Sequence, residues 1–213
     1  MPCGSVPVMA RDDERTSRAR ESPIVGGLPD VPGIVAAMRL TPSLERHLRG
    51  LADALLVREY PGATISRAER ELIATAVSAG NDCFYCMDSH GAFASELLTR
   101  EGASGVSDLI DGIKSGGSEG LSPKLAALVE IARGVQRNPR AVRREEVERA
   151  LAAGASDADT QLAVLIASAF CMYNRMVDGL RAPTPPSAEA YRARAGQIAD
   201  HGYSDSQITA IPR

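Results

Sequence analysis

Three side chains within eight residues could together carry redox chemistry: Cys83, Cys86 and His90. If residues 83–99 form a helix, these side chains fall on one stripe no wider than about 60° of its surface. Cysteines three residues apart in a helix lie about 5 to 6 Å apart at Cα, which is within the range that a disulfide allows. The pair can therefore cycle between dithiol and disulfide, with a histidine placed as a base beside the nucleophile.

Two physical effects lower thiol pKa values here, and they act on different cysteines. The helix dipole acts most strongly on Cys83, which begins the predicted helix. His90 leans over the turn that carries Cys86 and acts mainly on that thiol. From the position of His90 we predict that Cys86 attacks the substrate and that Cys83 is the resolving thiol.

A carboxylate precedes this group on the previous predicted helix. Glu71 lies twelve residues before Cys83 and is the last charged residue before a largely apolar run at 72–79. If the two helices fold back on each other, Glu71 could orient or deprotonate His90. It could equally be an exposed residue that pairs with Arg67 one turn earlier. The spacing does not distinguish these interpretations.

A structural zinc site is the main alternative use of such residues. Zinc needs four ligands, and Cys83, Cys86 and His90 supply only three, all on one narrow stripe that splays poorly for a tetrahedron. We therefore expect no metal ion and no other cofactor. The remaining candidates are expected in the core (Cys171), in the N-terminal tail (Cys3) or at the surface (His47, His201 and Asp88).

Helices are the elements that must position these side chains. Capping residues, proline and glycine predict helices at 41–57, 66–80, 83–99, 122–137, 144–153, 156–180 and 188–200. The segment 29–33 is expected to be irregular, and 102–120 to be a glycine-rich loop with at most one helical turn at 107–113. No segment alternates as a strand does, so the fold class is predicted to be all-α.

A weak internal repeat is consistent with this prediction. Placing Ser66 on Ser156 aligns Glu69 with Asp159, and each copy follows a helix that begins with Ser/Thr-Pro. The repeat indicates either a duplicated helical unit or chance similarity between alanine-rich helices.

Composition limits the compartment and the partners. The 213 residues carry a net charge of -3 and include four cysteines without a disulfide-framework pattern. We expect a cytoplasmic protein that binds no nucleic acid and no membrane. The expected organisation is a disordered N-terminal tail at 1–23, a helical domain at 24–182, and a C-terminal helix and tail at 183–213 that pack on the same domain.

The spacing of Glu71, Cys83-Phe84-Tyr85-Cys86 and His90 resembles that of the carboxymuconolactone decarboxylase and alkylhydroperoxidase D superfamily, within it the peroxidase-related members. The resemblance implies an all-α helical bundle that assembles as a homo-oligomer (dimer, trimer or hexamer). It also implies peroxide reduction at Cys86, a proton relay through Glu71 and His90, and a protein or lipoyl-type dithiol as reductant. An assembly is expected for a second reason, because alanine-rich amphipathic helices would leave apolar patches uncovered in one chain.

One position departs from the family pattern. Alkylhydroperoxidase D has a histidine just before the second cysteine, where this chain has Tyr85, which is either a core residue or a phenol donor to the peroxide. The segment Tyr173-Asn174-Arg175-x-x-Asp178 resembles a late helix of the peroxidase-related members. Its polar residues are expected either to line the pocket or to form a buried polar interface between subunits.

The leading hypothesis is a thiol-dependent peroxidase or disulfide oxidoreductase acting on a small hydroperoxide, with antioxidant function. The alternatives are a non-enzymatic redox-sensing or disulfide-exchange module and a zinc-binding structural domain.

Overall fold

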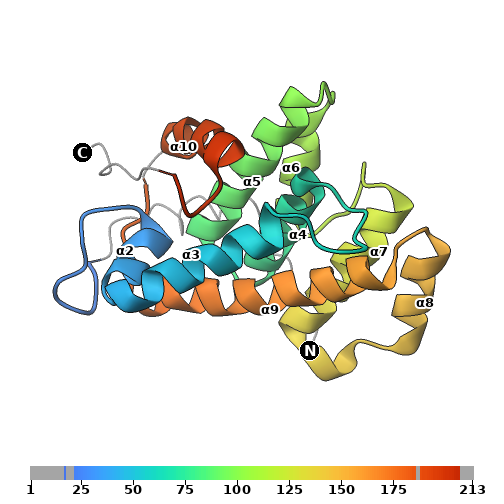
Figure 1. Cartoon of the computed structure of the whole chain (residues 1–213), viewed down its shortest axis with the longest axis horizontal. Coiled ribbons are helices and arrows are strands. Elements are labelled where there is room, and N and C mark those ends of the chain that lie inside the picture. Colours follow the sequence, from blue (N-terminus) through green and yellow to red (C-terminus); the bar gives the residue numbers. More distant parts are fainter. Residues whose placement is uncertain (1–16, 18–21, 186–187, 207–213) are drawn as a thin grey trace.

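Helices make up all the regular structure of the described part of the chain, in a computed structural model that describes residue 17 and residues 22–185 and 188–206. In chain order they are α2 (Gly33–Arg39), α3 (Pro42–Leu56), α4 (Arg67–Gly80), α5 (Phe84–Arg100), α6 (Val106–Lys114), α7 (Pro123–Arg137), the 3₁₀ turn η1 (Pro139–Ala141), α8 (Arg144–Ala152), α9 (Asp157–Gly179) and α10 (Ala188–His201) (Figure 1). These residues include no strand, which confirms the predicted all-α fold. Across the same residues, no helix combines the length and apolar character needed to cross a membrane.

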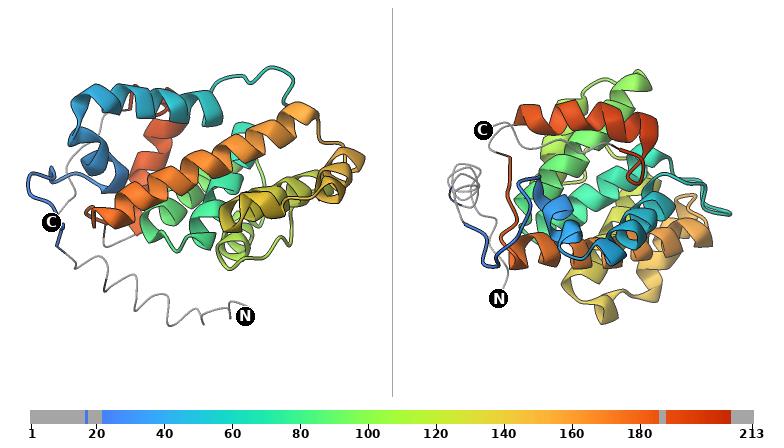
Figure 2. Two further views of the ribbon diagram at one scale, coloured as in Figure 1. Left: turned by 90° about the horizontal axis from the view of Figure 1, so that it is seen from below. Right: turned by 60° about the vertical axis from the view of Figure 1, so that its left-hand side comes forward.

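Helix α4 lies at the centre and determines how the other helices are arranged. It packs against α5, α7 and α9, and nearly all of its side chains are buried. The longest helix, α9, runs beside α3 on one side and α7 on the other, while α10 lies along α5 (Figure 2). The core is therefore formed around α4, and the polar side chains on its inner faces, Arg70, Glu71, Thr75 and Ser78, are removed from water.

The N-termini of α4 and α9 carry capping boxes, as their sequences predict. Ser66 accepts a hydrogen bond from the amide of Glu69, whose carboxylate accepts one from the amide of Ser66. Ser156 and Asp159 make the same reciprocal pair at α9. Asp159 also accepts hydrogen bonds from both Thr64 and Ile65, so the start of α9 holds the loop that leads into α4.

Two helices form where the sequence predicted at most one helical turn or no helix. The glycine-rich segment contains α6, nine residues instead of at most one turn, and Gly105 and Gly116 lie outside its two ends. Its apolar side chains recur at helical spacing, with Ile110 and Ile113 buried. The approach at 29–32 is irregular as expected, but helix α2 follows immediately after Pro32, where no helix was predicted.

The internal repeat holds only for its first part. Both copies begin with a capping box, but the chain breaks after α4 at residues 81–83 and starts α5, whereas α9 continues unbroken for 23 residues. Cys83 lies at the end of that break and Cys86 in the first turn of α5, so the second copy has no equivalent of the turn before the cysteine pair.

Candidate functional site

The turn between α4 and α5 places the two cysteines. Asn81 is the C-cap of α4, Asp82 has φ +53°, and Cys83 is the N-cap of α5. The amide of Cys83 donates to the Ser78 carbonyl at 3.0 Å, which fixes the turn. The predicted helix start at Cys83 is therefore one residue too early, because Cys83 is the N-cap and the helix begins at Phe84.

The cysteine pair is reduced and shielded from water. Cys83 and Cys86 are free thiols with exposed fractions of 0% and 2%. They lie in a small apolar cluster, the thiol cluster, whose other members are Leu28, Ile34, Tyr85, Ala92, Val177, Ala182 and Tyr191. Because segments from four regions of the chain contribute to it, the thiols are covered on all sides by side chains distant in sequence.

Cys83 keeps its proton. A hydrogen bond with Cys86 and then burial raise the pKa of Cys83 well above its ordinary value, and the negative charge of Asp178 acts in the same direction. The lowering of the pKa that the helix start was expected to bring to Cys83 was therefore wrong. A protonated Cys83 beside Cys86 fits the resolving role predicted for Cys83.

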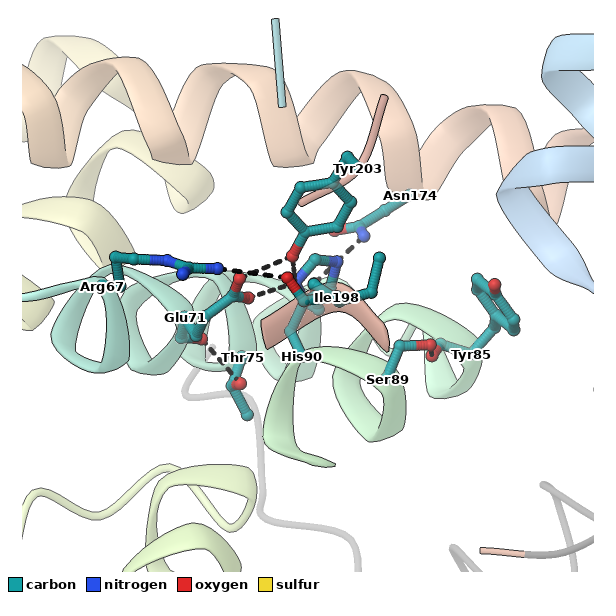
Figure 3. Close-up of polar contacts among 10 residues, drawn as sticks. Arg67, Glu71, Thr75, Tyr85, Ser89, His90, Asn174, Ile198 and Tyr203 are labelled. Atoms are coloured by element: carbon teal, nitrogen blue, oxygen red, sulfur yellow. Dashed lines mark hydrogen bonds and ion pairs between the residues drawn. The ribbon is translucent and has the colours of Figure 1, made fainter. Parts of the chain in front are cut away.

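Glu71 and His90 are brought together by the packing of α4 against α5. Nδ1 of His90 lies 2.6 Å from Oε2 of Glu71, and the glutamate is 1% exposed (Figure 3). A carboxylate can only accept, so Nδ1 of His90 donates to it, which leaves Nε2 as the ring nitrogen available for proton transfer. The alternative pairing of Glu71 with Arg67 was wrong, because Glu71 is buried and Arg67 donates instead to the carbonyls of Ile198 and Ala199.

Aromatic rings fix the orientation of the histidine. His90 meets Phe170 edge to face with centroids 4.5 Å apart and Phe93 with centroids 5.3 Å apart. With Nδ1 held by Glu71 and the ring enclosed, the imidazole has one orientation.

One residue of this site, Tyr203, was not predicted from the sequence. Its hydroxyl donates to Oε1 of Glu71 at 2.5 Å and lies 3.3 Å from Nδ1 of His90 (Figure 3). Its ring stacks on that of His90 with centroids 6.0 Å apart. Tyr203 lies 132 residues after Glu71, beyond the last helix, and no motif around it marks a functional residue.

Tyr85 belongs to the core, the first of its two expected roles, with a polar contact at its tip. It is 3% exposed, and Arg194 of α10 donates to its hydroxyl at 2.9 Å. Burial raises the pKa of Tyr85, so the phenol stays protonated. A Cβ atom on Gly33 would collide with the Tyr85 ring, which shows how closely α2 covers it.

The polar residues of the segment at 173–178 differ in how deeply they are buried. Asn174 is 1% exposed and bonds Ser78 at 3.1 Å and Asn81 at 2.7 Å, so it joins α9 to α4 and the cysteine turn rather than lining a pocket or a subunit interface. Arg175 is exposed, and Asp178 is half-buried near Cys83.

The other sequence candidates have these positions. Asp88, expected at the surface, is buried and pairs with Lys114 at 2.9 Å, because α6 packs on that face of α5. Cys171 is half-buried against the core, and His47 and His201 are exposed. Cys3 and most of the predicted tail lie outside the described residues. In the residues that the structure places, no three histidine, cysteine, aspartate or glutamate side chains are grouped as metal ligands would be.

A cavity of about 520 Å³ runs along α5 between α6 and α10. Ala92 and Tyr191 line it and also pack against the thiol cluster. These two side chains are therefore shared between the lining of the cavity and the thiol cluster.

Comparisons with known proteins agree with the all-α fold. Residues 42–101, which include α3, α4 and α5, match the carboxymuconolactone decarboxylase family. A solved structure of an uncharacterized peroxidase-related protein from Silicibacter sp. TM1040 is similar, with a TM-score of 0.64 and 23% identity over 83% of this chain and 95% of that one. A second, described as an alkylhydroperoxidase AhpD core and an uncharacterized peroxidase-related protein from Ralstonia eutropha JMP134, has a TM-score of 0.63 and 22% identity over 92% and 97%. The comparison with curated proteins found no match. Residues 42–101 are thus similar to the carboxymuconolactone decarboxylase family, and the described part of the chain has an all-α fold like that of the solved alkylhydroperoxidase AhpD core structure.

Proposed function

We propose that this protein is a thiol-dependent peroxidase that reduces a small hydroperoxide at Cys86. One observation carries the proposal: a buried dithiol lies one turn before His90, whose Nδ1 is held by the buried carboxylate of Glu71. A thiol, a base and a group that orients the base form the arrangement used in nucleophilic catalysis.

The reaction proceeds in two steps. The Cys86 sulfur attacks the distal oxygen of the hydroperoxide, an S–O bond forms and the O–O bond breaks. The leaving alkoxide or hydroxide takes the proton that His90 received from the Cys86 thiol, which leaves a sulfenic acid on Cys86. The Cys83 sulfur then attacks the Cys86 sulfur, an S–S bond forms, and the sulfenic oxygen leaves as water with the Cys83 proton.

A dithiol donor completes the cycle. It reduces the Cys83–Cys86 disulfide by thiol–disulfide exchange and is itself oxidised to a disulfide. The family resemblance favours a lipoyl-type or protein dithiol as donor. Substrate reaches the thiols from the cavity beside α5, which shares Ala92 and Tyr191 with the thiol cluster, when the side chain of Tyr191 moves.

Steady-state turnover tests the proposal. The protein is mixed with hydrogen peroxide, an organic hydroperoxide or a small disulfide, with dithiothreitol or dihydrolipoamide as donor. Loss of the oxidant is followed over many equivalents. We expect continuous consumption that the Cys86→Ser variant abolishes. Consumption that stops after one equivalent despite excess donor would contradict an enzyme and favour a redox sensor that is oxidised once.

A further inference from the structure

Tyr203 occupies the half of the Glu71 carboxylate that His90 does not. The phenol donates to Oε1 at 2.5 Å, while Nδ1 of His90 is bound to Oε2 at 2.6 Å. Both oxygens of a buried charge are therefore satisfied, each by a different donor. Burial raises the pKa of Tyr203 well above its ordinary value, and the charge of Glu71 adds to the effect, so the phenol remains a donor.

Helix α3 fixes the backbone that carries this phenol. The carboxylate of Asp53 accepts from the amides of Tyr203 at 2.6 Å and Ser204 at 3.0 Å, and Arg49 donates to the Tyr203 carbonyl at 2.9 Å. The preceding Gly202 has φ +71°, and a Cβ there would come within 2.8 Å of Asp53 Oδ1. The turn is thus held at both its amide and carbonyl groups, independently of what the phenol contacts.

A tyrosine needed only for packing would not require this arrangement. The clamp, which consists of the hydrogen bonds of Asp53 and Arg49 with the backbone of residues 203 and 204, places the Tyr203 hydroxyl against one oxygen of Glu71. That carboxylate orients His90, the base of the site. Without the phenol, Oε1 would keep its charge in an apolar surrounding, and the carboxylate could rotate away from His90 or take up a proton.

We propose that Tyr203 is a positioning residue of the thiol site, which holds the Glu71 carboxylate toward His90, and that Asp53 positions Tyr203. The proposal deepens the proposed function and rests on it for the role of His90. It makes the reactivity of Cys86 depend on α3 and on the turn after α10, neither of which contributes a residue to the thiol pair.

The test compares Tyr203→Phe with Tyr173→Phe. Tyr173 is also buried and also loses one hydrogen bond as phenylalanine, but its hydroxyl donates to the Leu48 carbonyl at 2.8 Å and not to Glu71. Alkylation of Cys86 by iodoacetamide is measured by peptide mass spectrometry from pH 5 to 9 in each variant. This readout uses no peroxide, so it can fail or succeed separately from the peroxidase assay.

We expect Tyr203→Phe to slow alkylation about tenfold near neutral pH, the factor associated with one lost hydrogen bond to a charged group. The acidic limb of its rate profile should move to higher pH, because a carboxylate that loses a donor accepts a proton more readily. Tyr173→Phe should keep the profile of the unaltered protein. Asp53→Asn, which keeps the phenol but weakens its clamp, should shift the limb in the same direction by less, and decides the matter if Tyr203→Phe does not fold. An unshifted profile in the folded Tyr203→Phe protein, or the same shift in Tyr173→Phe, overturns the proposal.

Discussion

Glu71 is the residue on which the chemistry of the site depends, because it is fully buried and shared between two donors. His90 and Tyr203 each take one of its oxygens, and the Tyr203 hydroxyl also lies 3.3 Å from Nδ1 of His90. The carboxylate therefore fixes both the proton on Nδ1 and the direction in which the imidazole faces.

Substitution at His90 and Glu71 should slow the reaction of Cys86 with peroxide to different extents. His90→Ala removes the base and should slow it by about 10² to 10⁴. Glu71→Gln should slow it less, because glutamine still fills the space. Some slowing remains, because the amide cannot accept from both His90 and Tyr203. Stopped-flow measurement of sulfenic acid formation gives the rates, with the exposed Glu148→Gln as control. A Glu71→Gln protein as slow as His90→Ala would mean that the carboxylate does more than orient the base.

Cys83 should ionise only at alkaline pH in the folded protein. Its hydrogen bond with Cys86 and its burial raise its pKa, whereas the same thiol in an unfolded chain ionises near about 8.5. The contribution of this thiol to folding is therefore fully present below about pH 8.5 and is lost as the pH rises above it, because the unfolded chain releases the proton first. Peptide mass spectrometry of alkylated Cys83 should show little reaction up to pH 9 in native protein and ready reaction in urea. Native alkylation with a midpoint below pH 8 would contradict the assignment.

The reactive residues could be predicted from sequence only where they share a helix. Cys83, Cys86 and His90 lie within eight residues, so helical geometry relates them directly. Glu71 depends on how two helices pack, and its spacing left two interpretations open. Tyr203 depends on a turn clamped by Asp53, 150 residues earlier, and no periodicity relates such distant positions.

The first turn of α9 holds the loop that precedes the central helix. Asp159 is buried there and accepts from the amides of Ser156, Thr64 and Ile65. Burial raises the pKa of Asp159, but these hydrogen bonds outweigh it and hold the pKa at about 2. Helix α9 and the start of α4 therefore form one structural unit around this carboxylate.

Asp159→Asn should lower the free energy of unfolding by about 2 to 4 kcal/mol, because an amide cannot accept all of these hydrogen bonds. Because the folded pKa lies below the unfolded value, the contribution of Asp159 is present above about pH 4 and is lost as the pH falls through about 2. Urea titrations at neutral pH measure the loss, with the exposed Asp157→Asn in the same turn as control, expected within about 1 kcal/mol. Equal losses in the two variants would show that capping alone matters at this terminus.

Elements were predictable where polar caps and apolar spacing agree. The capping boxes at Ser66 and Ser156 gave the starts of α4 and α9. Helix α6 was missed because its glycines dominate the composition of the segment, although its apolar residues follow helical spacing. Helix α2 was missed because its apolar run is short, and its position is fixed by packing over Tyr85.

Large apolar side chains remain exposed on the outer faces of α3 and α9. Leu44 and Leu51 lie seven residues apart on α3, and Leu165 and Met172 are spaced equally on α9; their exposed fractions lie between 38% and 53%. Residues seven apart share one helix face, so each pair forms an apolar stripe.

The whole molecule is expected to be a homo-oligomer that covers these stripes. Light scattering at micromolar concentration should give a mass that is a multiple of 22.5 kDa. Glutamate at Leu165 and Met172 together, or at Leu44 and Leu51 together, should reduce that mass, whereas glutamate at the exposed Ala54 alone should not. Particles of 22.5 kDa only, from the unaltered chain, would contradict the expectation.

Identification of the cysteine that takes the peroxide oxygen tests the central claim most directly. Each single variant, Cys83→Ser and Cys86→Ser, is treated with one equivalent of hydrogen peroxide and a dimedone-type probe, and the adduct is located by peptide mass spectrometry. Attack by Cys86 predicts a trapped sulfenic acid on Cys86 in the Cys83→Ser protein and little adduct in the Cys86→Ser protein, where burial still raises the pKa of Cys83. An adduct on Cys83 in the Cys86→Ser protein, with none on Cys86 in its counterpart, would contradict the assignment of roles and the function built on it.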